Sequence, residues 1–525
     1  MLLLKGLRAT LVMFTFAFIA NAGELEIEQC QELRGFLNSK LGNIDCLDQY
    51  HHFNSSGSRN FYTTQNSLTK RQVRISTFNV YQAGSTRTEF KDYELMAKMI
   101  NHWDVIGTTE LVNVIGIDKR HNEAVTNHYK KLLQHYRELV KTKAPKKEQS
   151  KVLSKISLLK KQYELPGYVK ILTELQKLDP SWSLLLSGNT EGTKTATIRE
   201  LSGYFYRSSS VKPVINEYCK KYYKFSKAYG CYPKFNKETY GHDVADLFAR
   251  RPFIGSFKSG NFDFTLVTTH VVFNAPSDEN LRKRIIKAAF GVDHYTEIGE
   301  GVTSRTYARF AEMTHILNFM RNYKMSFKEN DLILLGDFNL EAKNPYWKTL
   351  FDENPGMEIK IEGATSLAQS KTLSDGSSTH GTANNYDHFV LDTKITSQCA
   401  GKKNAKVFNF LENSFRKLID KKYLVRTDNA YVHPDTGLDM FYLDQKGKNK
   451  ALKITEKIVK RLKSKYTVKR GEIVPRFDLE KKAEDVVRKL IEPQLFERSY
   501  YRYFQETISD HLPVFMNCSN QQDDD

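Results

Sequence analysis

Residues 331–339 read DLILLGDFN, and this stretch decides the fold. Its first part, Asp331 to Leu335, is an apolar run whose length and turn-forming flank are typical of a buried β-strand. The polar residues of the following Gly336-Asp337-Phe338-Asn339 therefore fall at the end of that strand. Because α/β proteins usually place their sites at the ends of strands, Asp337 and Asn339 are the first candidates for a functional site.

The same pattern recurs along the chain. Further apolar runs lie beside polar residues that are suited to chemistry: Val73 to Phe78 before Asn79, Asp104 to Thr109 before Glu110, Phe262 to Thr269 before His270, and Phe389 to Leu391 just after Tyr386-Asp387. Apolar residues at three- and four-residue spacing predict helices between these runs, at Tyr93 to His102, Leu281 to Phe290 and Tyr307 to Tyr323. The chain is thus mixed α and β. One large domain with insertions, residues 23–525, fits the wide spread of these candidates better than several domains.

Residues 1–22 are typical of a secretory signal peptide. Lys5 and Arg8 form a charged start, an apolar run extends from Leu11 to Ile19, and Ala20-Asn21-Ala22 offers small residues for cleavage. This run is well short of the roughly 20 residues that span a bilayer, so we expect cleavage before Gly23 and no stable membrane anchor afterwards. The sequence therefore predicts a secreted protein, either periplasmic or extracellular.

The cysteines agree with export, which permits disulfide formation. The six cysteines fall into plausible pairs along the chain: Cys30 with Cys46, Cys219 with Cys231, and Cys399 with Cys518. Spacing alone leaves this connectivity open. The sequence contains neither a CxxC nor an HExxH motif, so a structural zinc site or a zinc-protease helix has no support.

The net charge of +18 is concentrated in two segments. Residues 118–170 contain 14 lysines and arginines against 5 acidic residues, and residues 401–505 contain 26 against 14. Both segments predict helices, at Lys130 to Val140, Lys151 to Gln162, Ala451 to Lys465 and Leu479 to Leu490. We interpret 118–170 and 396–506 as two helical basic insertions. Their charge favours a polyanionic partner, and solvated helical surfaces are the alternative.

Several candidate residues suit the hydrolysis of a phosphodiester, which needs a metal, an acid, a base and donors to the phosphate. Glu110 and Asp510 offer hard carboxylate oxygens and Asn79 a carbonyl oxygen. This set favours Mg²⁺, with Ca²⁺ or Mn²⁺ as alternatives, over zinc. Taken singly, each residue also has an ordinary structural explanation. Asparagine is a common turn former, and an isolated histidine such as His270 is more often structural.

Taken together, the motifs are specific. In chain order they are Arg74 to Val80 (RISTFNV), Thr109-Glu110, Thr269-His270, Gly336 to Asn339 (GDFN), Tyr386-Asp387-His388 and Ser509 to Pro513 (SDHLP). This ordered set resembles the signature of the endonuclease/exonuclease/phosphatase superfamily, of which GDFN and SDHLP are the strongest parts. The resemblance implies an α/β fold in four layers, an α/β/β/α sandwich of two packed sheets.

Within that superfamily the chain is most similar to deoxyribonuclease I. Glu200, in a strand-like run that ends at Arg207 (ELSGYFYR), resembles the family glutamate that supports the first catalytic histidine. Arg250, in Phe248 to Pro252 (FARRP), resembles the family arginine that contacts phosphate. The family tyrosine expected two residues before Glu200 is Ile198 here, so a contact to the substrate differs.

The resemblance implies a role for each residue. His270, oriented by Glu200, and His511, oriented by Asp387, would be the acid and base on opposite sides of the scissile phosphate. The cation would be held by Asn79, Glu110 and Asp510. Asp337 and Asn339 would orient water or phosphate, and Arg250 would bind phosphate oxygens.

We therefore expect a secreted, monomeric, metal-dependent endonuclease that cleaves nucleic acid, with double-stranded DNA as the substrate. Two alternatives are a sphingomyelinase-type phospholipase of the same superfamily and a non-catalytic nucleic-acid-binding protein. The positive charge, Glu200 and Arg250 weigh against the phospholipase. The presence of both histidines and both partner carboxylates weighs against a protein that has lost catalysis.

Overall fold

A computed structural model describes most of the chain from residue 43 onward. The described residues are 43–47, 50–55, 71–84, 91–112, 123–164, 166–189, 200–223, 227–235, 244–327, 329–372, 378–401, 404–411, 415, 418, 459–460, 504–505 and 507–522. Each of the apolar runs noted above contains a strand. The predicted signal peptide and Ile198 lie outside the described residues.

Eight described strands form the first sheet. In spatial order they are β1 (Asn43–Cys46), β2 (Tyr50–Asn54), β5 (Trp182–Asn189), β6 (Glu200–Arg207), β4 (Val105–Val112), β3 (Gln72–Ala83), β17 (Val514–Ser519) and β16 (Ala405–Val407). The central pair, β3 and β4, is parallel. Both strands continue past Asn79 and Glu110. Each contains an irregularity there that shifts the register of pairing.

A second sheet packs against the first. Its order is β12 (Met357–Ile359), β15 (Asp387–Asp392), β11 (Leu332–Asp337), β10 (Phe262–His270), β9 (Phe253–Ser259) and β7 (Lys212–Pro213), and β8 (Gly230–Cys231) also pairs with β9. Strands β10 and β11 are parallel, whereas β11 and β15 are antiparallel. A separate hairpin is formed by β13 (Leu367–Thr372) and β14 (Ser378–Thr382).

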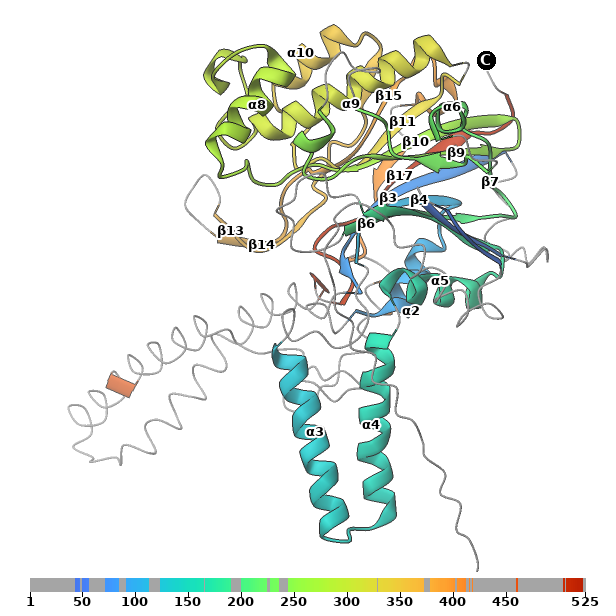
Figure 1. The fold of residues 1–525 in the computed structure, drawn as a ribbon, viewed down its shortest axis with the longest axis vertical. Helices are drawn as coiled ribbons and strands as arrows, with labels where there is room; N and C mark the ends of the chain where they lie inside the picture. Colours follow the sequence, from blue (N-terminus) through green and yellow to red (C-terminus); the bar gives the residue numbers. More distant parts are fainter. Residues whose placement is uncertain are drawn as a thin grey trace, which may run out of the picture.

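Helices cover the outer faces of both sheets, so the predicted α/β/β/α sandwich is confirmed (Figure 1). The second sheet is covered by α6 (Glu217–Tyr223), α8 (Glu279–Phe290), α9 (Tyr307–Ser326) and α10 (Tyr346–Glu353), and the first by α2 (Tyr93–Ile100) and α5 (Gly167–Leu178). Three apolar clusters separate these layers. The middle one joins the sheets, with Val105 and Tyr204 on one side and Leu266 and Leu335 on the other.

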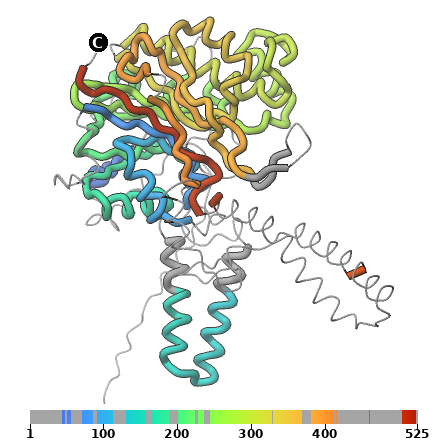
Figure 2. Tube along the Cα trace, turned by 180° about the vertical axis from the view of Figure 1, so that it is seen from behind, coloured from blue at the N-terminus to red at the C-terminus, as the bar shows by residue number. Residues whose placement is uncertain are grey.

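The first basic segment contains two long helices, α3 (Glu123–Lys141) and α4 (Lys146–Glu164), which project side by side from the sheets (Figures 1 and 2). The helices expected at Lys130 to Val140 and Lys151 to Gln162 lie within them. The second basic segment begins inside the fold, because β16 pairs with β17. The helices expected at Ala451 to Lys465 and Leu479 to Leu490 lie outside the described residues, apart from residues 459–460.

Two predicted disulfides are present. Cys219 is bonded to Cys231, and Cys399 to Cys518, with sequence separations of 12 and 119 residues. The third predicted pair involves Cys30, which lies outside the described residues. In the described part of the chain, none of the helices has the length and apolar character that crossing a bilayer requires.

The two disulfides should contribute unequally to stability. Chain entropy predicts a loss of about 3 kcal/mol on removing the 12-residue crosslink and about 5 kcal/mol on removing the 119-residue one. We expect urea unfolding of Cys399→Ser/Cys518→Ser to have the lower midpoint, with Cys219→Ser/Cys231→Ser as the matched control. Equal losses in the two double variants would contradict this ranking.

Candidate active site

Three of the candidate residues lie on neighbouring strands of the second sheet. His270 ends β10 and is paired in register with Asp337, which ends β11, and Asp337 is paired in turn with Asp387, which begins β15. This row is possible because Gly336 has a φ of +140°, and a Cβ there would lie 1.9 Å from the carbonyl oxygen of Thr269. The glycine of GDFN is therefore required by the close approach of two strands.

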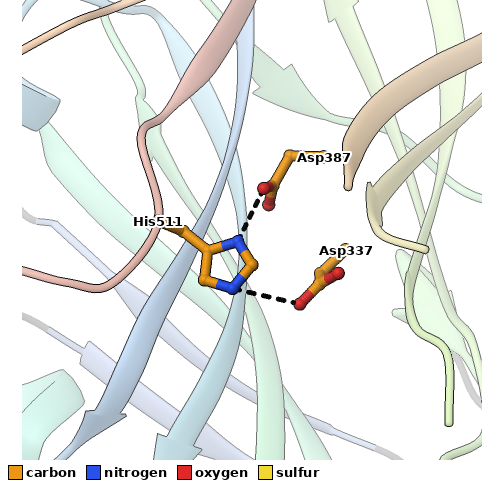
Figure 3. Close-up of side chains that lie close together, drawn as sticks. All are labelled: Asp337, Asp387 and His511. Carbon is orange, nitrogen blue, oxygen red and sulfur yellow. Dashed lines mark hydrogen bonds and ion pairs between the residues drawn. The ribbon is translucent and has the colours of Figure 1, made fainter. Parts of the chain in front are cut away.

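His511 joins this row from the chain just before β17 of the first sheet. Its Nδ1 lies 2.6 Å from Oδ2 of Asp387, and its Nε2 lies 3.5 Å from Oδ2 of Asp337 (Figure 3). Asp387 is fully buried, and its backbone N–H donates to the Thr365 hydroxyl. The imidazole is thus held between two carboxylates, with its Nδ1 side fixed by the shorter contact.

A second histidine–carboxylate pair faces the first. His270 Nδ1 lies 2.7 Å from Oε1 of Glu200, and His270 Nε2 lies 3.6 Å from the same Oδ2 atom of Asp337 that His511 approaches. Arg250 donates from Nε to the other Glu200 oxygen. The Nε2 atoms of both histidines therefore approach the same oxygen of Asp337, and the Nδ1 atom of each histidine is paired with a different carboxylate.

The proposed cation ligands lie beside these pairs. The Asn79 amide nitrogen donates to Oε1 of Glu110 at 2.8 Å and to Oδ2 of Asp337 at 3.1 Å, and the Asn79 amide oxygen accepts from the Tyr81 N–H. Asp510 Oδ1 is buried, has no hydrogen-bond partner among the described residues, and lies 4.0 Å from His511 Nε2. All ten site residues predicted from the sequence therefore lie at one place.

The backbone is unusual at this place. Among the described non-glycine residues, five have positive φ, and four of these line the site: Tyr81, Gln82, Glu110 and Asn339. The left-handed conformation of Glu110 accompanies the irregularity in β4 and lets its Oε2 accept from the Gln82 N–H. Such conformations are costly for non-glycine residues, and they often mark functional sites.

The electrostatics follow from burial and pairing. Burial alone would raise the pKa of Glu200, but Arg250 and His270 lower it to about 2. Burial acts to lower the pKa of His511, but Asp387 and Asp337 raise it well above its usual value. Burial raises the pKa of Asp510 to about 6, and the charge of Glu110 adds to the effect. The charge of the neighbouring His511 opposes this rise.

The donor set fits a hard divalent cation. Five carboxylates, whose oxygens are the ligands that such a cation prefers, lie near His270, His511, Arg250 and Lys91; they are Glu110, Glu200, Asp337, Asp387 and Asp510. The partnerless Asp510 oxygen is the kind of atom that a cation would satisfy. A second geometric candidate, Asp337 with Asp387 and His511, is already hydrogen-bonded through the imidazole.

Two residues that the sequence did not single out support the site from helix α9. Arg309 donates to the carbonyl oxygens of Phe273 and Asn339. One turn later, Glu312 accepts from the Ala249 N–H at 2.7 Å and the Val272 N–H at 3.1 Å. One helix therefore holds the chain segments next to Arg250, His270 and Asn339. The sequence shows only that Arg309 and Glu312 are opposite charges at helical spacing (RFAE); that both are buried cannot be seen from it.

Comparisons with known proteins give only distant likenesses. No family model and no curated protein matches the chain. An endonuclease/exonuclease/phosphatase family protein from Leptotrichia buccalis matches at 14% identity over 65% of this chain and 93% of its own, with a TM-score of 0.33. The superfamily in that name is the one that the motifs resemble.

Two further solved structures are similar to the same degree. The beta toxin of Staphylococcus aureus, as a beta hairpin deletion mutant, matches at 12% identity over 61% of this chain and 86% of its own, with a TM-score of 0.30. TDP2 from D. rerio, complexed with a single-strand DNA product, matches at 12% identity over 64% and 88%, with a TM-score of 0.29. TM-scores this low give no information on the function of this chain.

Glu312 should make stability depend on pH. Burial raises its pKa to about 7, so the folded protein binds this proton more tightly than the unfolded chain does. Its contribution is fully present below the unfolded pKa near 4.5 and is lost as the pH rises through about 7. The difference of about 2.5 pKa units corresponds to about 3 kcal/mol.

We therefore expect the difference in unfolding free energy between Glu312→Gln and the wild type to shift in favour of the variant by up to about 3 kcal/mol as the pH rises from 4.5 to 8, on top of a constant loss for the one N–H that the amide nitrogen cannot accept. The measurement is urea unfolding of both proteins across this range. A difference in unfolding free energy that stays constant with pH would show that Glu312 keeps an ordinary pKa.

Proposed function

We propose that this protein is a divalent-metal-dependent phosphodiesterase that cleaves nucleic acid as an endonuclease, with double-stranded DNA as its substrate. One observation carries the proposal: two buried histidine–carboxylate pairs direct their Nε2 atoms toward one carboxylate oxygen of Asp337, at 3.6 and 3.5 Å. Two opposed proton-transfer groups beside an acidic cluster are what in-line displacement at phosphorus requires.

Proton transfer is assigned to His270 and His511. In each imidazole the Nδ1 side is engaged by a carboxylate, which fixes the tautomer and stabilises the protonated form. The Nε2 atoms remain directed at the space that the phosphate would occupy. One histidine would accept a proton from the attacking water, and the other would donate a proton to the leaving oxygen.

The cation is assigned to Glu110 and Asp510, with Asn79 beside them. Asn79 orients Glu110 through its amide nitrogen, and its amide oxygen keeps a second lone pair for a ligand contact. Hard oxygen donors of this kind favour Mg²⁺, with Ca²⁺ or Mn²⁺ as alternatives. A bound cation would neutralise the charge that develops on the phosphate oxygens.

Contacts to the phosphate and to the attacking water are assigned to Arg250, Asn339 and Asp337. Arg250 is anchored by Nε to Glu200, and 27% of its side chain is exposed, so its terminal nitrogens are placed to meet phosphate oxygens. Asn339 is fixed by its side-chain amide nitrogen, which donates to the Val271 carbonyl oxygen at 2.8 Å. Asp337 would orient the attacking water rather than touch the anion.

The substrate assignment rests on charge. The net charge of +18 suits a polyanion better than a neutral or zwitterionic lipid headgroup, which makes the sphingomyelinase-type alternative the weaker one. Both histidines keep their carboxylate partners, which argues against a non-catalytic binding protein. The disulfides suit the oxidising compartments that a secreted monomer would meet.

Removing either histidine should abolish most of the activity. We expect His270→Ala and His511→Ala to fold and to nick supercoiled plasmid at least about a hundredfold more slowly, the usual effect of losing a general acid or base. Choline-phosphate release from sphingomyelin is measured in parallel. Near-wild-type nicking by both variants would exclude the assigned mechanism, and lipid hydrolysis without nicking would exclude the assigned substrate.

Metal dependence should follow Glu110. Wild-type cleavage should require Mg²⁺ and stop in EDTA, and Glu110→Gln should raise the Mg²⁺ concentration needed for half-maximal activity by at least about tenfold, because a charged ligand is replaced by a neutral one. Glu341→Gln, which changes an acidic residue on the loop after Asn339, is the matched control. Undiminished cleavage in EDTA would refute a metal-dependent mechanism.

A further inference from the structure

The hairpin of α3 and α4 is an appendage of the fold. Among the described elements, each of these helices packs chiefly on the other. The seam between them is thin: Val152 and Ile156 are buried, and Leu132, Tyr136 and Leu139 are half-buried. The hairpin therefore adds little to the core, and most of the side chains between residues 130 and 156 are exposed.

That surface is strongly basic and uncompensated. Residues 130–156 include nine lysines and arginines and two glutamates. Six of the cations recur at intervals of four or seven residues, which align side chains along a helix: Lys130, Arg137 and Lys141 on α3, and Lys147, Lys151 and Lys155 on α4. Within the described residues, no ion pair joins any of these six to an acidic group. Positive charges arranged in this way repel one another unless a bound anion neutralises them.

The described residues on either side of the hairpin lie at one end of β3 and β4, the strands that carry Asn79 and Glu110. A Cβ on Gly84, just after β3, would lie 2.6 Å from the Gly167 nitrogen and 2.9 Å from the Val112 carbonyl oxygen. Val112 ends the strand that precedes the hairpin, and Gly167 begins the helix that follows it. Glu110 is two residues before Val112, a distance of about 7 Å along a strand.

We propose that the α3–α4 hairpin is an arm that binds the phosphate backbone of duplex nucleic acid and holds it across the active site. The inference rests on the proposed function for the class of substrate. A helix of 19 residues is about 28 Å long, which matches roughly eight base pairs of duplex. Lysine contacts to phosphate carry no sequence information, so the arm gives affinity without sequence preference.

The apolar residues of the arm favour nucleic acid over an anionic membrane. A helix that lies in a membrane interface needs a continuous apolar face. On the arm the apolar residues are turned into the seam, and only Val140 and Leu153 are large exposed hydrophobic residues in its described part. Vesicle binding is therefore an outcome of the test and not the expectation.

The test compares three triple variants, each with three positive charges removed. Two alter the arm: Lys130→Gln/Arg137→Gln/Lys141→Gln and Lys147→Gln/Lys151→Gln/Lys155→Gln. The control alters exposed lysines on β7 and α6, at the far edge of the second sheet: Lys212→Gln/Lys220→Gln/Lys221→Gln. Affinity for a labelled 20-base-pair duplex is measured in EDTA at several salt concentrations, and circular dichroism and urea unfolding check the fold.

Each arm variant should flatten the slope of log affinity against log salt by about 0.9 for every phosphate that the arm no longer neutralises, and by up to about 2.7 in all. Affinity at 0.1 M salt should fall at least about tenfold, while the control stays parallel to the wild type. Parallel lines for both arm variants, an equal fall in the control, or loss of binding only to phosphatidylserine vesicles would each overturn the proposal.

Wild-type hydrolysis of bis(4-nitrophenyl) phosphate, a diester too small to reach the arm, separates this inference from the proposed function. Duplex binding through the arm without hydrolysis of any diester would overturn the proposed function but would support the inference that the arm binds duplex nucleic acid. Hydrolysis of the small diester together with unchanged salt slopes would overturn the inference about the arm but would support the proposed function.

Discussion

The close approach of β10 and β11 at Gly336 is the constraint on which the site depends. Since a side chain at this position would collide with the Thr269 carbonyl oxygen, only glycine lets the two strands pair in the observed register. That register places His270 beside Asp337 and, one strand further, Asp337 beside Asp387. A shift by one residue would turn each of these side chains to the opposite face of the sheet. The relative positions of His270, Asp337 and Asp387 thus follow from the register of the backbone.

The second constraint is the cost of burying charge. Glu200, Asp337 and Asp387 are all at most 5% exposed, and an unpaired carboxylate at such depth would be neutralised by a large pKa shift. Each has a histidine beside it, and Asp337 is shared by both imidazoles, although burial still raises the pKa of Asp387. Removing one member of a buried pair typically costs about 3–5 kcal/mol, because the other charge is left alone. The same pairing that stabilises the fold therefore holds the two histidines in place.

The sequence predicted the parts of this arrangement that depend on local pattern. Apolar runs located the strands, and the polar residues beside them gave candidates such as Glu110, His270 and Asp337, whereas Glu200 and Arg250 were inferred from the family resemblance. Local pattern carries no information on contacts across layers, so Arg309 and Glu312 on α9 were missed. The positive φ of Glu110 was also missed, because glutamate gives no sign of a left-handed conformation. The pairing of β16 with β17 was missed for a related reason, because it joins residues that are distant in sequence.

The position of the basic hairpin links these constraints to binding. Val112 before the hairpin and Gly167 after it meet at Gly84, where backbone packs on backbone with no room for a Cβ. Strands β3 and β4 end here and carry Asn79 and Glu110. The chain on either side of the hairpin is therefore close to the proposed cation ligands. Because the described cations of the hairpin, between Lys130 and Lys155, are separate from the residues of the site, affinity for a polyanion and the chemistry of cleavage would be separate properties of the chain.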